Sequence, residues 1–561
     1  EFYGMYFQDD WKLSPKITIN LGLRDEYETA YHDAAHILGG LDLSAPNPAY
    51  GGGNAPAMPA AALAIAGSNY YQWNGQWNFT SSSNPGMWNP QKIALQPRVG
   101  IAYAINDRTA LRVGYSIYMT PTAGMYLNGI AGQGDVNAIG PPYYGVFGTQ
   151  YTLNPLQGVP QEYFADPFPA ASNPLAPLLG RASGPQLGTG GESLEFYPKN
   201  MTKAYNQRFN INLQHEFPGQ YVVSATYFLN IGDKWYSQAL NQPNPQYLTA
   251  NESALTTTVA NPFYHYLSNT IVPGPLWNQP DVTLSQLLVP YPQYGALVAM
   301  GGCCAPERYN SLELKAQKAF SKGYNFLITY VYIRERSAWN SLTDYALYAN
   351  EFQWLDSNQP HQRFNAAGTY EIPFGKGRTY LSDINRVGDA VIGGWKLTGL
   401  LTMMSGDYVT FNGGSGELNN PQGGNMIWSG QSPCVANPTP SAWFNISVFQ
   451  SIPSNVAFTP RTNPYTFDCM TGPHFLNLDA TISKFFRITE KFRLEMRMNV
   501  YNTLNNLNRS DPSVNIGPGF GQALYQGAPG GIFGQAGNGG GYPSPTSVAG
   551  RQLEFGLKLL F

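Results

Sequence analysis

The chain has 561 residues, of which 12% are charged and 14% are aromatic, and its net charge is -3. A soluble domain carries about 25% charged residues, whereas low charge with many aromatics is typical of a protein that meets lipid along a belt and water at both ends. With 32 Lys and Arg against 35 Asp and Glu, no basic stripe is present, which excludes the electrostatic footprint of a nucleic-acid-binding protein.

The mean hydropathy of -0.28 is too low for a bundle of membrane helices, and the sequence contains no run of about 20 apolar residues. The best candidate, residues 55–67, is too short and contains Pro56 and Pro59, so we expect a loop there. No signal peptide precedes the strand-like opening at Glu1. We therefore expect that a signal has been removed or that the chain is a fragment of an exported protein.

Alternation with the period of a strand is the decisive pattern. From Phe492 to Val500 every even position is apolar and every odd position is polar. Successive side chains of a strand point to opposite faces, so one face of this segment is apolar and the other is hydrated. A shift of one residue would move Arg493, Glu495 and Arg497 onto the lipid face. Because one Arg or Lys at the lipid midplane costs roughly 2–4 kcal/mol, the register of this segment is fixed.

The same alternation recurs from one end of the chain to the other. It covers residues 17–24, 111–119, 209–214, 221–229, 312–317, 395–402, 476–483 and 553–561. Tilted strands need about 9–11 residues to cross a membrane, whereas strands of soluble proteins average about 5–6. Some polar residues fall on the apolar set, and we expect most of them near strand ends, where headgroups and water are in reach; they are Asp25, His215, Lys318, Arg334 and Lys484.

Connection lengths give an independent test. Short turns rich in Pro, Gly, Asn and Ser alternate with long loops, and one turn, from Phe374 to Val391, is longer than the others. The long loops cover residues 32–96, 120–204, 232–307, 337–362, 412–474 and 509–549. Outer-membrane barrels have short periplasmic turns and long extracellular loops. The sequence therefore predicts an all-β fold, an antiparallel transmembrane β-barrel of the bacterial outer membrane.

We count roughly thirteen strands by this pattern. Single-chain bacterial barrels have an even number of strands, and an open edge inside lipid leaves backbone groups unpaired. Either at least one strand precedes Glu1 or one strand within the chain escapes the pattern, and the abrupt start without a signal peptide favours the first. We therefore expect residues 1–561 to form the C-terminal part of one barrel domain, a partial barrel.

Particular segments resemble the barrel region of TonB-dependent transporters, specifically the Oar-like group. They lie in the first and last predicted strands; the middle strands match only in pattern. The matching segments are residues 6–12 (YFQDDWK), 21–24 (LGLR), 475–479 (FLNLD), 484–486 (KFF), 497–505 (RMNVYNTLN) and the terminal 550–561 (GRQLEFGLKLLF). In this order the motifs are specific for the family.

This resemblance implies an N-terminal plug inside the barrel and a periplasmic motif that binds the TonB complex, and neither is visible in this chain. It also implies that Phe561 closes a signal read by the barrel-assembly machinery, together with Leu559, Leu557 and Phe555. The alternative is that Phe561 is simply the last residue that faces lipid.

Aromatic residues gather in the first two long loops. Exposed aromatic rings bind sugars, aromatic ligands or partner proteins, but such rings also pack loops onto one another. The candidate ligand-contact residues are Tyr70, Tyr71, Trp73, Trp77, Trp88, Tyr143 and Tyr144.

Four cysteines allow three pairings, which the sequence cannot separate. Cys434 and Cys469 fall in one long loop, where a disulfide is plausible in an oxidising compartment. The adjacent Cys303 and Cys304 either pair with each other or stay free. We identify no catalytic, cofactor-binding or metal-binding residues; His32 and His36, four residues apart, lack the helical pattern of a metal site.

The sequence thus predicts a TonB-dependent receptor barrel that contacts outer-membrane lipid and imports a large extracellular solute, and not an enzyme. The first alternative is an outer-membrane adhesin or structural barrel without transport. The second is a soluble extracellular β-protein that binds glycans. The identity of the solute cannot be inferred, because a fold does not determine its ligand.

Overall fold

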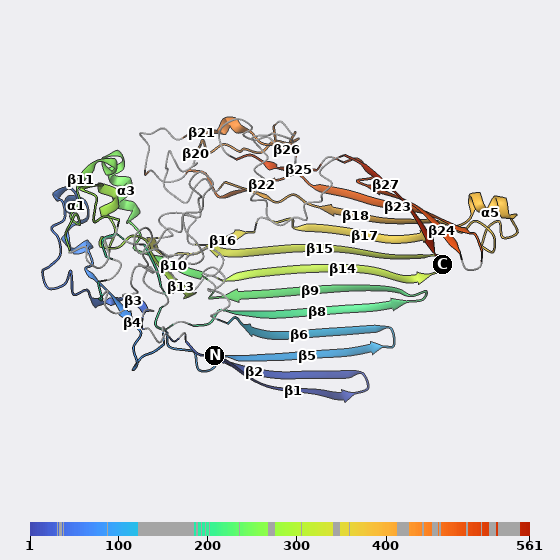
Figure 1. The fold of residues 1–561 in the computed structure, drawn as a ribbon, viewed down its shortest axis with the longest axis horizontal. Helices are drawn as coiled ribbons and strands as arrows, with labels where there is room; N and C mark the ends of the chain where they lie inside the picture. The colour runs from blue at the N-terminus through green and yellow to red at the C-terminus, as the bar shows by residue number, and fades with distance from the viewer. Residues whose placement is uncertain are drawn as a thin grey trace, which may run out of the picture.

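The structure is a computed structural model of the whole chain, and its main feature is one long, twisted antiparallel sheet (Figure 1). It describes residues 1–561 except 31, 33–35, 37–38, 87, 122–183, 187–188, 192, 197, 201, 235, 268–274, 304–305, 340–347, 350, 358, 412–425, 440–441, 452–457, 459–461, 490–491, 507, 515–522, 526–549 and 561.

The main sheet has 14 described strands, and all except β16 (Gln353–Asp356), which pairs with the end of β15, follow one another across the sheet in chain order. The thirteen long strands are β1 (Phe2–Ser14), β2 (Ile17–Glu28), β5 (Leu95–Asn106), β6 (Thr109–Met119), β8 (Tyr205–Phe217), β9 (Tyr221–Asp233), β14 (Glu307–Ser321), β15 (Tyr324–Trp339), β17 (Gln362–Glu371), β18 (Trp395–Met404), β23 (Phe475–Arg487), β24 (Arg493–Tyr501) and β27 (Gln552–Leu560). The predicted strands and their up-and-down order are confirmed.

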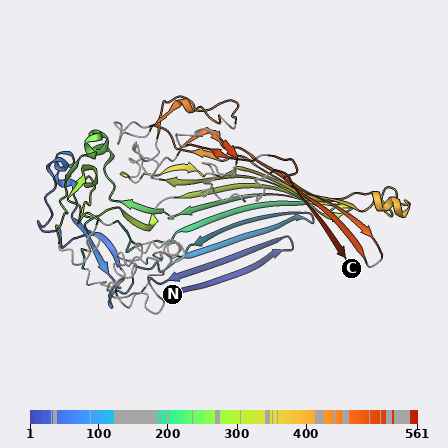
Figure 2. The same cartoon turned by 45° about the horizontal axis from the view of Figure 1, so that its top comes forward.

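Short turns join the strands at one end of the sheet, and the long loops join them at the other (Figure 1). β1 and β27 stand at the two ends of the sheet order, and no pairing between them is present among the described residues, so the sheet does not close on itself. Figure 2 shows how strongly the strands twist across the sheet, with β27 steeply inclined to β1.

Strand register sorts the side chains into two faces, because residues paired across neighbouring antiparallel strands point to the same side. Ile211 of β8 pairs with Val113 of β6 on one side and with Tyr227 of β9 on the other. The next residue, Asn212, pairs with Arg112 and Thr226 on the opposite face. We call these the apolar face and the polar face. The apolar side chains are exposed in the chain alone, as Met5 (78%) and Phe555 (76%) illustrate.

Two lysines break the apolar face near the turn end, and both are covered. The Lys318 ammonium donates to the carbonyls of Ser321 (2.8 Å) and Tyr324 (3.1 Å) and lies 3.9 Å from the centroid of the Tyr324 ring. Lys484 donates to carbonyls of the neighbouring β17–β18 connection and contacts the rings of Trp395 and Phe486. Carbonyl oxygens and aromatic faces therefore stabilise each charge where the strand leaves the apolar zone.

The other interruptions of the apolar face also have partners near strand ends. Asp25 accepts a hydrogen bond from the backbone N–H of Ala94 (2.7 Å) at the loop end, and Arg334 forms an ion pair with Asp356 (3.3 Å). His215 lies 2.7 Å from the Thr109 hydroxyl at the turn end. Asp9, which we did not identify from the sequence, also falls on the apolar face, opposite Leu21.

The long loops are folded structures in their own right. They contain small sheets formed by β3 (Gly39–Pro46), β4 (Asn74–Phe79), β7 (Leu194–Phe196), β10 (Tyr236–Leu240), β11 (Thr258–Ala260), β12 (Asp281–Thr283), β13 (Leu297–Cys303), β19 (Tyr408–Thr410), β20 (Met426–Trp428), β21 (Phe449–Ser451), β22 (Thr466–Thr471), β25 (Arg509–Pro512) and β26 (Ala523–Tyr525). They also contain the helices α1 (Ala60–Ala66) and α3 (Pro245–Asn251) and the short 3-10 helices η1 (Ser68–Tyr70), η4 (Glu252–Thr256), η5 (Leu284–Leu287) and η6 (Ile446–Val448). Helix α5 (Arg386–Ile392) lies in the turn between β17 and β18.

Most of the fully buried side chains lie in these loops and not in the main sheet. One hydrophobic cluster joins residues 50–71 to residues 248–288, and a second joins β3 and β4 to β7 and β13. The buried residues of a third lie within residues 409–470, and Val514 packs against them. None of the helices in the described residues has the length and apolar character needed to cross a membrane.

We expect Ile211→Arg to destabilise the full-length protein in a bilayer by about 2–4 kcal/mol, because the substitution places a charge on the apolar face near the middle of β8. The matched control is Asn212→Arg, the same new side chain one residue away on the polar face. Urea unfolding of the protein reconstituted in phospholipid vesicles measures both. Equal losses for the two variants would contradict the assignment of the faces.

Candidate functional site

Arginine side chains line one region of the polar face. Arg98 of β5 and Arg208 of β8 are both paired with Ser116 of β6, so their side chains lie on the same face with one strand between them. Tyr118, two residues beyond Ser116, fills that space: its ring centroid is 5.0 Å from the Arg98 guanidinium carbon and 4.7 Å from that of Arg208. Stacking on one ring thus holds two cations side by side.

Neutral amide oxygens orient the guanidinium groups of Arg112 and Arg208. Arg112 of β6 donates to Asn212 (3.4 Å) and to Gln214 (3.2 Å), and Arg208 donates to Asn230 (3.2 Å). An amide oxygen accepts a hydrogen bond but does not neutralise a charge. In the part of the chain that the structure describes, Arg98, Arg112 and Arg208 form no ion pair. We call these three residues the arginine patch.

Charged residues at the loop end of the adjoining strand β2 and just before β8 are neutralised. Arg24 of β2 pairs with Glu26 (2.5 Å), and the buried Lys203 lies 3.5 Å from Glu28. These neighbouring basic groups therefore have carboxylate partners, whereas the three residues of the arginine patch have none among the described residues. Exposed guanidinium groups with unused N–H donors favour binding of carboxylate, phosphate or sulfate groups.

On β24 and β27 the polar face carries charges of both signs. Glu495 pairs in register with Lys558. Glu554 accepts hydrogen bonds from Asn499 (2.8 Å) and from the Tyr501 hydroxyl (2.9 Å). Mixed charges in register give little net potential, so this side of the sheet lacks the concentrated positive charge of β5, β6 and β8.

The loop aromatics that the sequence singles out lie mainly inside the loop clusters. Trp77, Trp88 and Tyr71 are buried, with Trp77 only 2% exposed. Tyr70 is half-buried and donates to the Leu288 carbonyl (3.0 Å), and Trp73 stacks on Tyr50 with ring centroids 5.7 Å apart. This burial favours the packing interpretation over ligand stacking for these five residues. Tyr143 and Tyr144 lie outside the described residues.

Burial also changes the ionisation of loop tyrosines. Desolvation raises the pKa of Tyr50 to about 12 and that of Tyr71 to about 12. Both hydroxyls therefore remain protonated at neutral pH, and that of Tyr71 is buried without a hydrogen-bond partner among the described residues. Neither has the lowered pKa of an activated phenol.

A cleft of about 1010 Å³ separates the β3–β4 hairpin from residues 185–200 and β10. Lys199 enters it and donates to Asn84 (3.2 Å) and to the Gly86 carbonyl (3.1 Å), and desolvation lowers the pKa of this lysine. Asp42 lines the same cleft, and its pKa is lowered mainly by a hydrogen bond from Ser44. The cleft therefore offers one cation and one carboxylate to a polar ligand.

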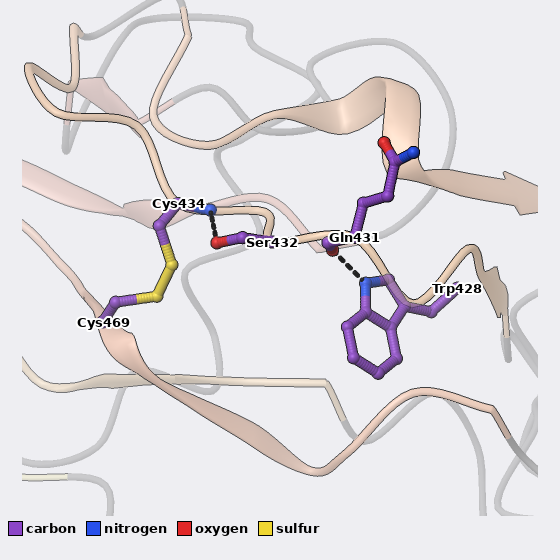
Figure 3. Close-up of a disulfide and its surroundings, with 5 residues drawn as sticks. All are labelled: Trp428, Gln431, Ser432, Cys434 and Cys469. Carbon is purple, nitrogen blue, oxygen red and sulfur yellow. Dashed lines mark hydrogen bonds between the residues drawn. A yellow bond between two sulfur atoms is a disulfide. The ribbon is translucent and has the colours of Figure 1, made fainter.

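Cys434 and Cys469 form a disulfide in the third loop cluster (Figure 3). Beside it, the Cys434 N–H donates to the Ser432 hydroxyl (3.2 Å) and the Trp428 indole donates to the Gln431 carbonyl (2.6 Å). The bond closes a stretch of 35 residues around the buried aromatic rings of the cluster. Cys303 ends β13, and Cys304 lies outside the described residues.

On the terminal strand β27, Phe555, Leu557 and Leu559 share the apolar face and are well exposed. Their partners across β24 are Met498, Met496 and Leu494. Phe561 lies outside the described residues. The position of the three described residues fits lipid contact, and their part in assembly stays a prediction.

We expect Cys434→Ser/Cys469→Ser to weaken the 409–470 cluster by about 2–4 kcal/mol, because the cross-link no longer restricts the unfolded loop. Limited proteolysis of intact outer membranes should cleave this loop faster in the variant, and reduction of the wild-type protein should have the same effect. Cleavage in the 248–288 cluster serves as the internal control and should not change. Unchanged protection of 409–470 would contradict a stabilising role.

Comparison with known proteins identifies the class. The family model described as "Outer membrane beta barrel domain" matches residues 1–531. The chain therefore belongs to the family of outer-membrane β-barrel domains, which confirms the predicted fold class and a location in the bacterial outer membrane. The polar face is the lumen wall of such a barrel, and the apolar face meets lipid. A search of curated proteins gave no match.

Solved structures that this chain matches include three receptors. The ferripyoverdine receptor of Pseudomonas aeruginosa has 9% identity and a TM-score of 0.38, over 100% of this chain and 38% of that one. The siderophore receptor PiuA of Acinetobacter baumannii has 10% identity and a TM-score of 0.33, over 90% and 39%. The ferric-catecholate import receptor Fiu of E. coli has 8% identity and a TM-score of 0.35, over 91% and 41%. This chain spans about two fifths of the length of these proteins.

Proposed function

We propose that this chain is part of the barrel of a TonB-dependent transporter that binds a large solute outside the cell and passes it inward. The observation that carries the proposal is the width of the sheet. Eight strands enclose an interior that side chains just fill, whereas barrels with many more strands hold a channel or a plugged lumen. Thirteen long strands with a continuous polar face are typical of the larger barrels, which hold a channel or a plugged lumen.

The motifs of the first and last strands support transport that depends on TonB. The segments 6–12 and 497–505 resemble those of TonB-dependent transporters and lie in β1 and in β24 with the turn that follows it. Under this proposal, residues 1–561 are the C-terminal part of the barrel. The plug and the TonB-binding motif then belong to a segment N-terminal to this chain.

The arginine patch supports a solute class. A solute that carries carboxylate, phosphate or sulfate groups would find three guanidinium groups without carboxylate partners on one side of the lumen. Each charge-assisted hydrogen bond stabilises such a complex by roughly 1.5–3 kcal/mol. Positive potential inside a low-dielectric wall also concentrates anions near the patch.

Cross-linking to TonB tests the transport mechanism without knowledge of the solute. We expect the full-length protein, in outer membranes of its own host, to form a formaldehyde cross-link to TonB that is lost when the predicted TonB-binding motif is deleted. A transporter already known to need TonB in the same cells is the positive control. If that control cross-links and this protein does not, the transport proposal fails, and an adhesin or structural barrel becomes the better account.

We expect Arg98→Gln/Arg208→Gln to weaken binding of a tricarboxylate probe, citrate, to the purified full-length protein by at least about 10-fold, because two charge-assisted contacts are lost. The single variants Arg208→Gln and Arg497→Gln form the matched comparison. Each removes one positive charge from the polar face, the first on β8 within the patch and the second on β24 outside it. Isothermal titration at low and high salt measures the affinities. An equal effect of the two single variants would assign binding to net charge and not to the patch.

A further inference from the structure

One connection at the turn end differs from its neighbours. β17 and β18 are joined through residues 372–394, which carry helix α5 and project beyond the ends of the strands (Figure 1). The neighbouring turns between β8 and β9 and between β14 and β15 span only residues 218–220 and 322–323. A turn needs no more than that to join antiparallel strands. We call residues 372–394 the foot.

The foot is attached to the side of the sheet that faces lipid. Trp395 and Lys484 are paired across β18 and β23 and both lie on the apolar face. The Lys484 ammonium donates to the carbonyls of Asp389 (3.5 Å), Val391 (3.4 Å) and Gly393. The Trp395 indole donates to the Val391 carbonyl (2.9 Å). A cation and an indole on the apolar face therefore cap the C-terminal carbonyls of α5.

Internal hydrogen bonds hold the foot in one conformation. The Asn385 side chain caps the start of α5 by accepting from the Gly388 N–H (2.7 Å). The Asp389 carboxylate accepts from the Lys376 N–H (2.7 Å), and Arg378 forms an ion pair with Glu371 (3.0 Å). The foot is thus a defined structure attached to the strands on both sides.

Several apolar side chains of the foot are exposed. Val387 and Val391, one helical turn apart, are 76% and 66% exposed. Tyr380 and Leu381 are also more than half exposed. Leu381 has a φ of +58°, a backbone conformation that a branched residue rarely adopts. Strained backbone is concentrated at functional sites, so the exposed Leu381 favours a surface that contacts a partner.

Position and charge identify that partner as lipid. The foot stands where the strands leave the apolar zone, beside Trp395 and Phe486, whose rings suit the membrane interface. The foot also carries Lys376, Arg378 and Arg386 against Asp383 and Asp389, three positive charges against two negative ones. Exposed valine and leucine next to basic residues are typical of segments that lie in the headgroup and acyl boundary and attract anionic lipids.

We infer that the foot is an interfacial anchor that places Val387 and Val391 in the leaflet at the turn end of the barrel. Its basic residues contact phospholipid headgroups, and its apolar side chains replace lipid contacts that the strands give up at their ends. The anchor fixes the depth of β17, β18 and β23 in the membrane. This inference needs only membership in the barrel family and is independent of transport.

Photo-cross-linking in native outer membranes tests it. p-Benzoylphenylalanine replaces Val387 or Val391 in the full-length protein, and mass spectrometry of the irradiated foot peptide identifies the adduct. We expect a phospholipid adduct at both positions, as at the positive control Leu397, an exposed residue on the apolar face of β18. Asp107, in the turn between β5 and β6, is the solvent-exposed control and should give none.

Two outcomes would overturn the inference. An adduct to a protein at positions 387 and 391 would make the foot a protein-docking surface. No adduct there, with a lipid adduct at Leu397, would place the foot in water. Heat-modifiable migration on gels confirms that each variant has assembled as a barrel, so that a misfolded variant is not counted. The separate test of cross-linking to TonB is independent of this experiment, so either proposal can fail while the other holds.

Discussion

The structure depends on one constraint: inside a bilayer, every backbone N–H and C=O must pair within the protein, and few charges can remain on the lipid face. An antiparallel sheet meets the first demand between neighbouring strands. A side-chain period of two meets the second, because it separates polar and apolar residues without breaking the ladder. In β8, Ile211 and Asn212 are adjacent in sequence and lie on opposite faces. The same rule repeated over thirteen strands defines both a lipid surface and a lumen wall.

The lysine exceptions to this rule show where the membrane ends, whereas Asp9 lies on the apolar face in the middle of β1. Lys318 and Lys484 lie on the apolar face, yet their ammonium groups turn toward the carbonyls of the adjoining connections. Both lie beside aromatic rings, Tyr324 in one case and Trp395 in the other. Charges placed this way are costly at mid-depth and tolerated at the interface. The two lysines therefore mark the level at which the strands pass from hydrocarbon to headgroups, and the foot begins at that level.

Strand positions and connection lengths could be predicted from the sequence because alternation is a local property. The strand β24, for example, is already defined by the order of residues from Phe492 to Val500. The interior of the loops could not be predicted, since its contacts join distant segments. Asn47 hydrogen-bonds Tyr294 across 247 residues (3.3 Å), and aromatic residues expected at a ligand surface, such as Trp77, are buried there. Composition alone does not separate a packed aromatic ring from a binding platform.

The arginine patch was missed for a related reason. Each of Arg98, Arg112 and Arg208 looks in sequence like one more polar residue of an alternating strand, and only the register of β5, β6 and β8 brings the three together. Register also shows that their partners are amides and a tyrosine, while Arg24 nearby has a glutamate. Alternation constrains which face a charge occupies but leaves its sign free. Selectivity can therefore evolve on the lumen wall without disturbing the lipid face, and the sign of the unpaired charge is the feature from which a solute class can be inferred.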